Sequence, residues 1–521
     1  MRYIEKLKMI NFKRFTNTEV KFKNDMNLII GDNEAGKSSI LEAIDFVLSG
    51  NKIKVENSGI EQLFNKKTVE DFMNGNRDYN NMPIMIIELY LNEQSDPRLN
   101  GENNIDGLAF DGLRMICEPN DELSQVITEI LSEDDVVFPF EYYKISFFTF
   151  AGQGYTGYNR FMRKIFIDST IMNTEYAARE YIKDVYSKNV TPEEDMKNKN
   201  EYRKSKSEFS NNVLNDLNEK IGKYSFGLKT DTKSNLYNDL SIYEDNIAIE
   251  SMGKGRQCFI KMEVALNNDR QENDVDILLL EEPENHLSHV NVNKLIKEVL
   301  KSQTKQKFIT THSSMVSSRL DLRKAIMINS SNDVVMKLED LSEDTAEFFI
   351  KAPNNNILEY VLSKKVILVE GDAEYILMEA LFEKVTGEEL SKSGIHIISV
   401  GGTSFKRYMD IGKLLNIKTA VIRDNDGDYQ NNCIDNYTDY VIDHIKVFAD
   451  QDNGKNTFEV CMYNINQDIC EGLFLEGRKT LTVQEYMLKN KADAAFELLD
   501  KKSNDLVVPT YIKEAIEWIR E

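Results

Sequence analysis

Short apolar runs that end in glycine or in acidic residues recur along the chain. Several of them are followed by segments in which apolar residues repeat at helical spacing, as in the stretch after Lys37. Strands that alternate with amphipathic helices are typical of α/β folds. We therefore predict an α/β protein, with strands in the runs 26–30, 82–91, 138–150, 276–281, 307–311, 364–369, 395–400 and 419–422.

One long segment interrupts this pattern. From residue 157 to residue 245 charged and polar side chains dominate, and we predict a helical insertion there. A solvated arm without chemistry is one interpretation of this insertion. A length of 521 residues suits two or three domains. The predicted domains are 1–156 and 246–345 for the two parts of a head, 157–245 for the insertion, and 346–521 for a C-terminal domain.

Composition excludes several classes of protein. Hydrophobic residues make up 41% of the chain and charged residues 29%, which is ordinary for a soluble globular protein. No apolar run approaches the ~20 residues of a membrane helix, and no signal peptide precedes the first strand, so we predict a cytoplasmic protein with no membrane partner. The five cysteines are scattered, which disfavours zinc ribbons and disulfide frameworks. The net charge of −23 argues against strong nonspecific DNA binding but leaves room for a local basic surface.

The segment from Gly31 to Ser39 lies between a predicted strand and a predicted helix and reads Gly-Asp-Asn-Glu-Ala-Gly-Lys-Ser-Ser. A glycine-rich turn in this position presents backbone N–H groups and a helix N-terminus to phosphate. We expect Lys37 to contact the β- and γ-phosphates and Ser38 to bind Mg²⁺. A chance match is the alternative, but the flanking strand and helix favour nucleotide binding. The residues predicted to bind ATP in this loop are Asn33, Gly36, Lys37, Ser38 and Ser39.

Two stretches outside this loop resemble RecF/SMC-like ABC ATPases. Residues 10–15 read Ile-Asn-Phe-Lys-Arg-Phe and resemble the opening of those proteins, and residues 251–257, Ser-Met-Gly-Lys-Gly-Arg-Gln, resemble their signature motif. The resemblance implies that Ser251 and Gly253 contact the γ-phosphate bound by a second protomer. Gln153 would be either the phosphate-sensing glutamine of ABC ATPases or a simple loop residue. The same resemblance favours a role in dimerisation for the predicted helical insertion.

Two further strands end in polar residues. Residues 276–286 read Asp-Ile-Leu-Leu-Leu-Glu-Glu-Pro-Glu-Asn-His, an apolar strand that ends in carboxylates. In the same resemblance Glu281 holds Mg²⁺ through water and Glu282 polarises the attacking water. ABC ATPases usually carry aspartate at the first of these positions, so Glu281 is a departure. His312 follows the strand 307–311 at the switch-histidine position, although a lone histidine is more often structural.

The C-terminal domain carries a second set of acids. Strand 364–369 leads to Glu370 and a glycine turn, Glu374 lies on the following helix, and Asp424 and Asp426 come after strand 419–422. Because the carboxyl ends of parallel strands meet at one edge of a sheet, these carboxylates should meet at one site. Acids gathered in this way repel unless divalent cations neutralise them, which is the two-metal design for phosphodiester chemistry. Residues 424–428 superficially resemble a Ca²⁺ loop, but the position of the glycine and the preceding strand favour the Toprim arrangement.

An ABC-type P-loop ATPase head with a helical insertion, followed by a C-terminal Toprim (Rossmann-like) domain, resembles the OLD (overcoming lysogenisation defect) family of ATP-dependent nucleases. The resemblance covers nearly the whole chain. It implies a DNA endonuclease regulated by its ATPase head, with ATP and Mg²⁺ or Mn²⁺ as cofactors. It also implies a double-stranded DNA substrate and a homodimer or homotetramer. The class includes the nuclease subunit of the Gabija anti-phage system and retron-associated effectors, so the resemblance allows for a helicase-like or retron defence partner.

The resemblance also assigns roles to individual residues of the C-terminal domain. It makes Glu370, Glu374, Asp424, Asp426 and Glu459 metal ligands, and counts Glu370, Asp424 and Asp426 as catalytic as well. Glu459 ends the stretch Asn-Thr-Phe-Glu at 456–459. Lys491 begins the stretch Lys-Ala-Asp-Ala-Ala-Phe at 491–496 and takes the position of the catalytic lysine, where it would stabilise the pentacoordinate phosphate.

Other functions fit the sequence less well. A RecF/SMC-like DNA-binding ATPase in repair, with a regulatory Toprim domain, has no need of Glu370 beside Asp424 and Asp426. A topoisomerase requires a nucleophilic tyrosine in a separate DNA-gripping domain, and a primase usually has a zinc ribbon; neither is visible in the sequence. The fused Toprim domain disfavours a subunit of an ABC transporter.

Overall fold

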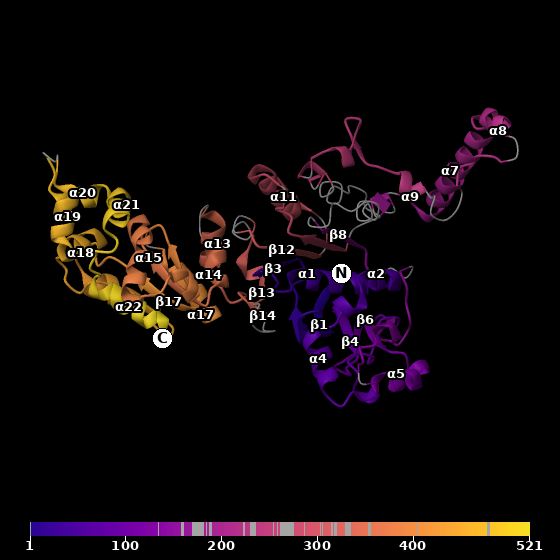
Figure 1. Ribbon diagram of the computed structural model, residues 1–521, viewed down its shortest axis with the longest axis horizontal. Coiled ribbons are helices and arrows are strands. Elements are labelled where there is room, and N and C mark those ends of the chain that lie inside the picture. Colours follow the sequence, from indigo (N-terminus) through magenta and orange to yellow (C-terminus); the bar gives the residue numbers. More distant parts are fainter. Residues whose placement is uncertain are drawn as a thin grey trace. The chain divides into compact units, whose positions relative to one another are not determined.

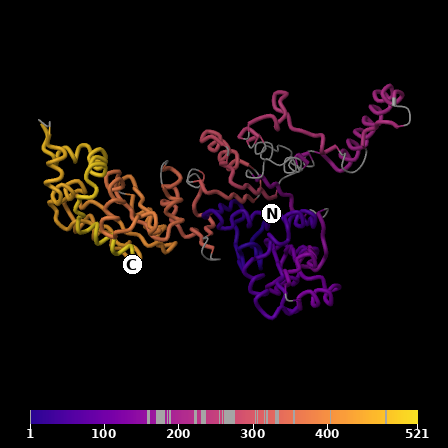
Figure 2. The backbone as a smooth tube through the Cα atoms, in the orientation of Figure 1, coloured from indigo at the N-terminus to yellow at the C-terminus, as the bar shows by residue number. Residues whose placement is uncertain are grey.

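The computed structural model divides the chain into two compact units (Figures 1 and 2). The N-terminal unit comprises Met1–Thr311 and Ser330–Val335, and the C-terminal unit comprises His312–Asn329 and Met336–Glu521. The structure describes residues 2–133, 135–157, 161–168, 182–183, 185–186, 190–221, 224–229, 236–253, 255–257, 259–260, 276–285, 287–302, 304, 306–313, 316, 320–328, 335–352, 356–402, 404–476 and 480–521. None of the helices among these residues is long and apolar enough to cross a lipid bilayer.

The N-terminal unit contains an antiparallel sheet with strand order β2-β1-β4-β6-β5, and β7 also pairs with β6. Alternating residues of β1, among them Leu7 and Met9, are fully buried, because one face of the sheet covers the core. The strands predicted at 82–91 and 138–150 correspond to β4 and β7 and are shorter than predicted. The strands are β1 Ile4–Phe12, β2 Phe15–Lys21, β4 Met85–Leu91, β5 Asn100–Gly101, β6 Phe110–Pro119 and β7 Tyr143–Thr149.

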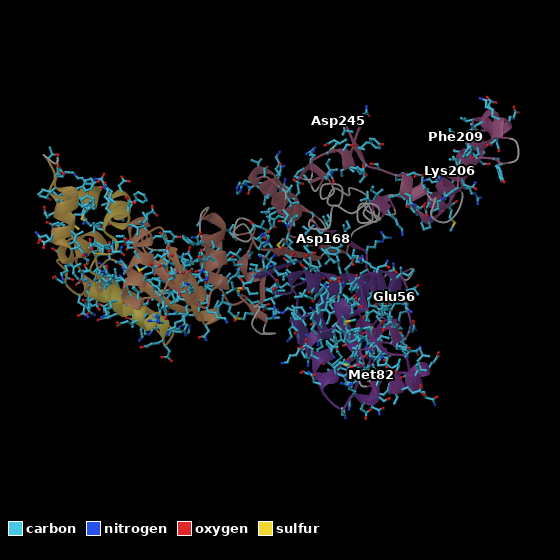
Figure 3. The ribbon with its side chains drawn as sticks, in the orientation of Figure 1. Glu56, Met82, Asp168, Lys206, Phe209 and Asp245 are labelled. Atoms are coloured by element: carbon cyan, nitrogen blue, oxygen red, sulfur yellow. The ribbon has the colours of Figure 1, made fainter. Side chains whose placement is uncertain are left out.

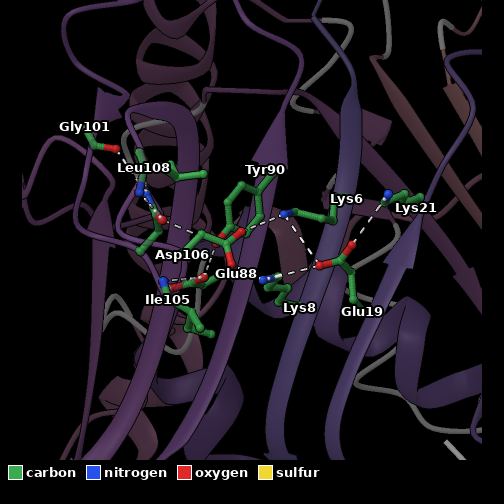
Figure 4. Close-up of polar contacts among 11 residues, drawn as sticks. Lys6, Lys8, Glu19, Lys21, Glu88, Tyr90, Gly101, Ile105, Asp106 and Leu108 are labelled. Atoms are coloured by element: carbon green, nitrogen blue, oxygen red, sulfur yellow. Dashed lines mark hydrogen bonds and ion pairs between the residues drawn. The ribbon is translucent and has the colours of Figure 1, made fainter.

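The other face of this sheet carries a polar network (Figure 4). Lys6 Nζ lies 2.8 Å from Asp106 Oδ2 and 3.9 Å from the centroid of the Tyr90 ring. Glu88 is fully buried and accepts hydrogen bonds from the Tyr90 hydroxyl at 2.9 Å and the Ile105 N–H at 3.0 Å. Burial raises the pKa of Glu88. These contacts hold the loop around residues 103–108 against the sheet.

A second sheet, which is parallel, carries the predicted phosphate-binding loop. Strands β3 (Met26–Gly31), β12 (Gln306–Thr311), β11 (Ile277–Glu281) and β8 (Lys164–Asp168) lie next to one another in that order, and every residue of β3, β11 and β12 is buried. Strands that are buried on both faces read as continuous apolar runs, which is why they were visible in the sequence. Helix α1 (Lys37–Ser49) packs against β4 and β6 of the antiparallel sheet and also against this parallel sheet.

The segment predicted as a helical insertion is only partly helical. Residues 164–168 form β8, in which Ile165 and Ile167 are buried, so this stretch belongs to the parallel sheet. Helix α7 (Pro192–Asn212) begins with a capping box between Thr191 and Glu194 and has no buried residue. Figure 3 labels Lys206 and Phe209 on α7. The smaller elements that follow are α8 Asn215–Ile221, α9 Leu236–Asp239, β9 Tyr243–Glu244 and β10 Ile247–Ala248.

The C-terminal unit contains a four-stranded parallel sheet with order β16-β15-β17-β18. Its strands are β15 Lys365–Val369, β16 Ile395–Ser399, β17 Lys418–Ile422 and β18 Ile445–Phe448. Helix α15 (Asp372–Thr386) packs against β16, α17 (Phe405–Leu415) packs against β17 and β18, and α22 (Thr510–Arg520) packs against β17. A core that includes Leu377, Phe382, Leu498 and Ile516 joins the sheet to the helices α18 Phe458–Ile465, α19 Gln467–Phe474, α20 Val483–Lys489 and α21 Lys491–Lys502.

The described residues form further helices and strands. In the N-terminal unit they are α2 Lys52–Asn57, α3 Ile60–Leu63, α4 Lys66–Asn74, α5 Ser124–Leu131 and α11 His289–Lys301. The others are β13 Ala325–Ile328, β14 Val335–Lys337, α13 Glu343–Lys351, α14 Ile357–Leu362 and α16 Leu390–Ser393. The domain boundaries 1–156, 157–245, 246–345 and 346–521 stay a prediction.

Candidate functional site

The predicted phosphate-binding loop joins β3 to α1. Gly36, the residue before α1, has a φ of 94°, and a Cβ atom at this position would lie 2.6 Å from Phe15 Cζ, so only glycine fits. Lys37 is 5% exposed, and its ammonium donates hydrogen bonds to Gly31 O at 2.7 Å and Asp32 O at 2.9 Å. Burial lowers the pKa of Lys37, while the charge of Glu282 opposes that shift. The loop therefore holds a desolvated cation directly beside backbone N–H groups, which is the arrangement that binds phosphate.

The other predicted residues of this loop differ in exposure. Asn33 and Ser38 are exposed, whereas Ser39 is buried at the start of α1. The Ser38 hydroxyl forms a hydrogen bond with the Glu281 carboxylate, so the two predicted Mg²⁺-site residues lie together.

Carboxylates gather at the ends of β8 and β11. Glu281, the last residue of β11, is 6% exposed, and its register partner is Asp168, the last residue of β8 (Figure 3). Burial first, and then the charge of Asp168, raises the pKa of Glu281 to about 7. Glu282 follows with a φ of 42°, and its N–H donates to Thr310 O at 3.1 Å. The sequence interpretation missed Asp168, because its strand lies within the segment predicted to be helical.

The remaining residues predicted for the ATPase site lie in turns. Ser251 ends a short 3₁₀ helix, and Gly253 follows in an exposed turn. His312 comes directly after β12 and is exposed. Gln153 is also exposed, in the turn after β7. Their predicted contacts with nucleotide stay predictions.

The C-terminal unit brings four acidic side chains to the carboxyl edge of its sheet. Glu370 follows β15, and Glu374 is in the first turn of α15 and 5% exposed. Asp424 follows β17 and is 7% exposed, and Glu459 is in the first turn of α18 and 2% exposed. The N–H of Phe458, which precedes Glu459, donates a 2.7 Å hydrogen bond to Asp424 Oδ1. Side chains that are far apart in the sequence therefore meet where the sequence predicted a site.

Burial and neighbouring charges raise the pKa values of three of these acids. Burial, followed by the charges of Glu374, Glu370 and Glu459, raises the pKa of Asp424 to about 8. Burial, followed by Glu459 and Glu370, raises the pKa of Glu374 to about 7. Burial also raises the pKa of Glu370, an effect that the nearby Arg423 guanidinium opposes. Positive charge that enters the site would lower these raised pKa values and so favour loss of the protons.

Lys491 completes this acidic cluster. It is the first residue of α21, its side chain is about half exposed, and its Nζ lies 3.1 Å from Glu459 Oε2 in an ion pair without hydrogen-bond geometry. Burial lowers the pKa of Lys491, but Glu459 and Asp424 outweigh that effect, so the pKa is raised overall. Lys491 stays protonated at neutral pH and adds a positive charge next to the acids.

Asp426 differs from the other predicted ligands. Its backbone has a φ of 50°, and its side chain is 51% exposed and lies 3.1 Å from Arg423 Nη2. Arg423 also donates to the Tyr437 hydroxyl at 2.9 Å, which fixes the guanidinium. Asn425, 1% exposed, donates to Asp450 O at 2.7 Å and so fixes the loop between the two aspartates. The sequence interpretation missed both Arg423 and Asn425, although they stand directly beside the Asp-x-Asp pattern.

The donor set fits a divalent cation. Among the described residues, Glu370 Oε2 and Glu459 Oε1 are buried without a hydrogen-bond partner, and Glu459 Oε2 pairs with the Lys491 ammonium without hydrogen-bond geometry. Buried carboxylates normally accept hydrogen bonds or bind a cation. No three His, Cys, Asp or Glu side chains in the described part of the chain already surround a common point as metal ligands would. Carboxylate rotamers would therefore have to change on binding, and the predicted two-metal site stays a prediction.

Fold and sites together define an ABC-type ATPase head followed by a Toprim domain. Residues 6–225 match the family model of the AAA domain, and residues 361–426 match that of the overcoming lysogenization defect protein-like TOPRIM domain. The second match contains Glu370, Glu374, Asp424 and Asp426. The predicted fold class and the resemblance to OLD-family nucleases are confirmed.

Two known proteins match part of the chain. The chain is 29% identical over 178 residues to "Endonuclease GajA" of Bacillus cereus strain VD045, covering 33% of this chain and 31% of that protein. It is 28% identical over 196 residues to "Old nuclease" of Escherichia phage P2, covering 34% of this chain and 33% of that protein. The matches thus span about a third of each relative's length. The C-terminal region of the Burkholderia pseudomallei OLD protein aligns with 30% of this chain at 22% identity, over 98% of its own length, with a TM-score of 0.25.

Proposed function

We propose that this protein is a metal-dependent DNA endonuclease whose cleavage is regulated by nucleotide bound to its ATPase head. The observation that carries the proposal is the cluster formed by the buried side chains of Glu374, Asp424 and Glu459 and the half-buried Glu370, with Lys491 at its edge. Burying carboxylates that raise one another's pKa costs free energy, and an inert or purely regulatory domain would have no functional reason to keep them. The similarity to an endonuclease and to a nuclease supports the same proposal.

Each residue of the cluster would have a separate role in hydrolysis. Mg²⁺ or Mn²⁺ would supply Lewis acidity and an activated water for phosphodiester hydrolysis. Glu370, Glu374, Asp424 and Glu459 would hold the metal, and the Phe458 N–H keeps the Asp424 carboxylate in place. The Lys491 ammonium would stabilise the negative charge that develops on the phosphate. Because Arg423 pairs with Asp426, we assign Asp426 a weaker part in metal binding than Asp424.

The ATPase head would bind Mg²⁺ and ATP at the loop from Asn33 to Ser39. Phosphate oxygens would replace the carbonyl oxygens of Gly31 and Asp32 as acceptors for Lys37. Ser38 and Glu281 would bind Mg²⁺, Glu282 would polarise water, and His312 would contact the γ-phosphate. Ser251 and Gly253 would complete the site of a second protomer, so we propose a homodimer or homotetramer, which light scattering at micromolar concentration would reveal as a mass well above 60.1 kDa.

The relatives also suggest a biological role for the protein and a form of regulation. We propose that the protein acts in anti-phage defence on double-stranded DNA, as the likeness to the Gabija nuclease suggests, and that ATP restrains cleavage until cellular nucleotide falls. Mechanistically, such control requires that ATP bind two conformations of the protein with different affinity.

Incubation with supercoiled plasmid DNA tests the proposal. Wild-type protein should nick or cleave the plasmid with Mg²⁺ or Mn²⁺, and chelation should stop the reaction. Asp424→Ala should abolish cleavage, whereas Asp428→Ala, which removes an exposed aspartate of the same loop, should leave it intact. Intact plasmid in every wild-type reaction, with and without ATP, would refute nuclease activity and favour a RecF/SMC-like DNA-binding ATPase.

A further inference from the structure

Three lysines lie at the start of the strands of the Toprim sheet, at the edge opposite to the acids. Lys365 and Lys418 are the first residues of β15 and β17 and are register partners. Lys446, the second residue of β18, is the register partner of Ala420, which lies two residues after Lys418. Side chains two residues apart on a strand point to the same face, so the three lysines share one face of the sheet.

Helix α22 covers this face and contributes the only tryptophan of the chain. Lys418 Nζ lies 4.8 Å and Lys446 Nζ lies 5.2 Å from the centroid of the Trp518 ring, within the range of cation–π interactions. Lys365 Nζ donates a 2.6 Å hydrogen bond to Arg520 O in the last turn of α22. We call Lys365, Lys418, Lys446 and Trp518 the lysine–tryptophan patch.

No ion pair between described residues neutralises this patch. Among the described residues, none of its three lysines forms an ion pair with a carboxylate, whereas Lys351 and Lys501 of the same unit pair with Glu347 and Glu497 at 2.6 and 2.8 Å. The side chain of Lys446 is exposed and the Trp518 ring is half-buried, so the patch is open to a partner.

The charges of the patch also repel one another. Burial lowers the pKa of Lys418, and the charges of Lys365 and Lys446 lower it further, while Glu521 acts in the opposite direction. Holding like charges together costs free energy, and a partner with closely spaced negative charges would relieve that cost. A polyanion matches a row of cations better than a single anion does.

We propose that the lysine–tryptophan patch binds the phosphate backbone of duplex DNA. The inference rests on the proposed function, because DNA is the substrate proposed there, and it adds a contact surface away from the cleavage site. A chain with a net charge of −23 repels DNA overall, so binding needs a local basic surface of this kind. A contact outside the site would hold the duplex while the acids act on one phosphate.

Binding of a labelled 30-base-pair duplex at several salt concentrations, with chelator present, tests the patch. Each phosphate contact contributes a slope of about −0.9 to the plot of log K against log salt, so Lys418→Gln/Lys446→Gln should make the slope shallower by about 1.8. Lys418→Arg/Lys446→Arg, which keeps the charge, and Lys351→Gln/Lys501→Gln, the matched control, should leave the slope unchanged. DNA should also change the emission of Trp518, and salt should reverse that change.

The outcomes separate the two proposals. If the folded Lys418→Gln/Lys446→Gln protein keeps the wild-type slope while wild type cleaves plasmid, the patch only caps α22, and the inference is overturned while the proposed function stands. If wild type neither binds nor cleaves DNA, both are overturned. A shallower slope in the glutamine variant alone supports the patch.

Discussion

Replacing Asp424 by asparagine isolates the charge at the centre of the acidic cluster. Asparagine has nearly the same shape, and its side-chain oxygen can still accept the hydrogen bond from the Phe458 N–H, which is 2.7 Å long in the wild-type protein. Asp424 is 7% exposed, and burial together with neighbouring acids raises its pKa to about 8. The substitution therefore removes a titrating group with little change in packing.

The size of the effect follows from the difference in pKa between the folded and unfolded states. An unfolded aspartate has a pKa of about 3.9. Because the folded pKa is higher, the stabilising contribution of protonated Asp424 is fully present below pH ~3.9 and is lost as the pH rises towards about 8. The loss is at most ~1.4 kcal/mol per pH unit, so between pH 6 and pH 8 the metal-free wild-type protein should lose about 2.5 kcal/mol of unfolding free energy through this residue.

Urea unfolding followed by Trp518 fluorescence measures this effect, because the only tryptophan lies in α22 of the same unit. In chelator, the loss of unfolding free energy between pH 6 and pH 8 should be about 2.5 kcal/mol smaller for Asp424→Asn than for wild type. Asp428→Asn, an exposed change in the same loop, should behave like wild type. Added Mg²⁺ should stabilise wild type most at pH 8, because binding requires the deprotonated acids. Equal pH dependence in wild type and Asp424→Asn would refute a proton held at this position.

Four further predictions concern the two sites. Lys37→Ala should weaken ATP binding at least ~10-fold in equilibrium filter binding, since hydrogen bonds to charged groups contribute ~1.5–3 kcal/mol. Gly36→Ala should also impair ATP binding in that assay, because the added Cβ would lie 2.6 Å from Phe15 Cζ at a φ of 94°. Lys491→Ala should slow plasmid cleavage by about 10²-fold, as for loss of other charge-stabilising groups, whereas Lys489→Ala, an exposed change at the end of α20, should not. An ATP titration should alter cleavage by wild type but not by Lys37→Ala, and an equal response in both would disprove coupling through this loop.

The carboxyl-edge rule explains why much of the acidic cluster could be predicted from the sequence. Glu370 and Asp424 follow buried parallel strands, and such strands end at a common edge whatever the loops between them do. Glu459 and Lys491 lie on helices, so no strand pattern indicates them, and the resemblance to a family supplied them. The structure places Lys491 against Glu459 at 3.1 Å, which the spacing of their motifs alone does not determine.

Pairing between distant strands explains what the sequence interpretation missed. Strand β8 has only five residues and lies in a polar segment, so nothing local indicates that Asp168 is the register partner of Glu281. The Asp-x-Asp spacing likewise does not determine in which direction each of the two aspartate side chains points. A left-handed residue at Asp426 turns its side chain outward to Arg423, so the two aspartates of one motif have different surroundings.

The hydrophobic core beneath the acids explains the raised pKa values of Asp424 and Glu374. Helix α15, which carries Glu374, packs against α21, which begins with Lys491, through core residues that include Leu377 and Leu498. This packing holds the charged ends of both helices in place and excludes water from the carboxylates, and burial is the largest cause of the raised pKa of Asp424 and Glu374. Leu498→Ala, which loosens the packing between α15 and α21, should expose the carboxyl groups more to water and lower those pKa values even though it removes no acid. The pH dependence of the unfolding free energy should then flatten, as predicted for Asp424→Asn, and this would show that the packing below the site controls the pKa values of its acids.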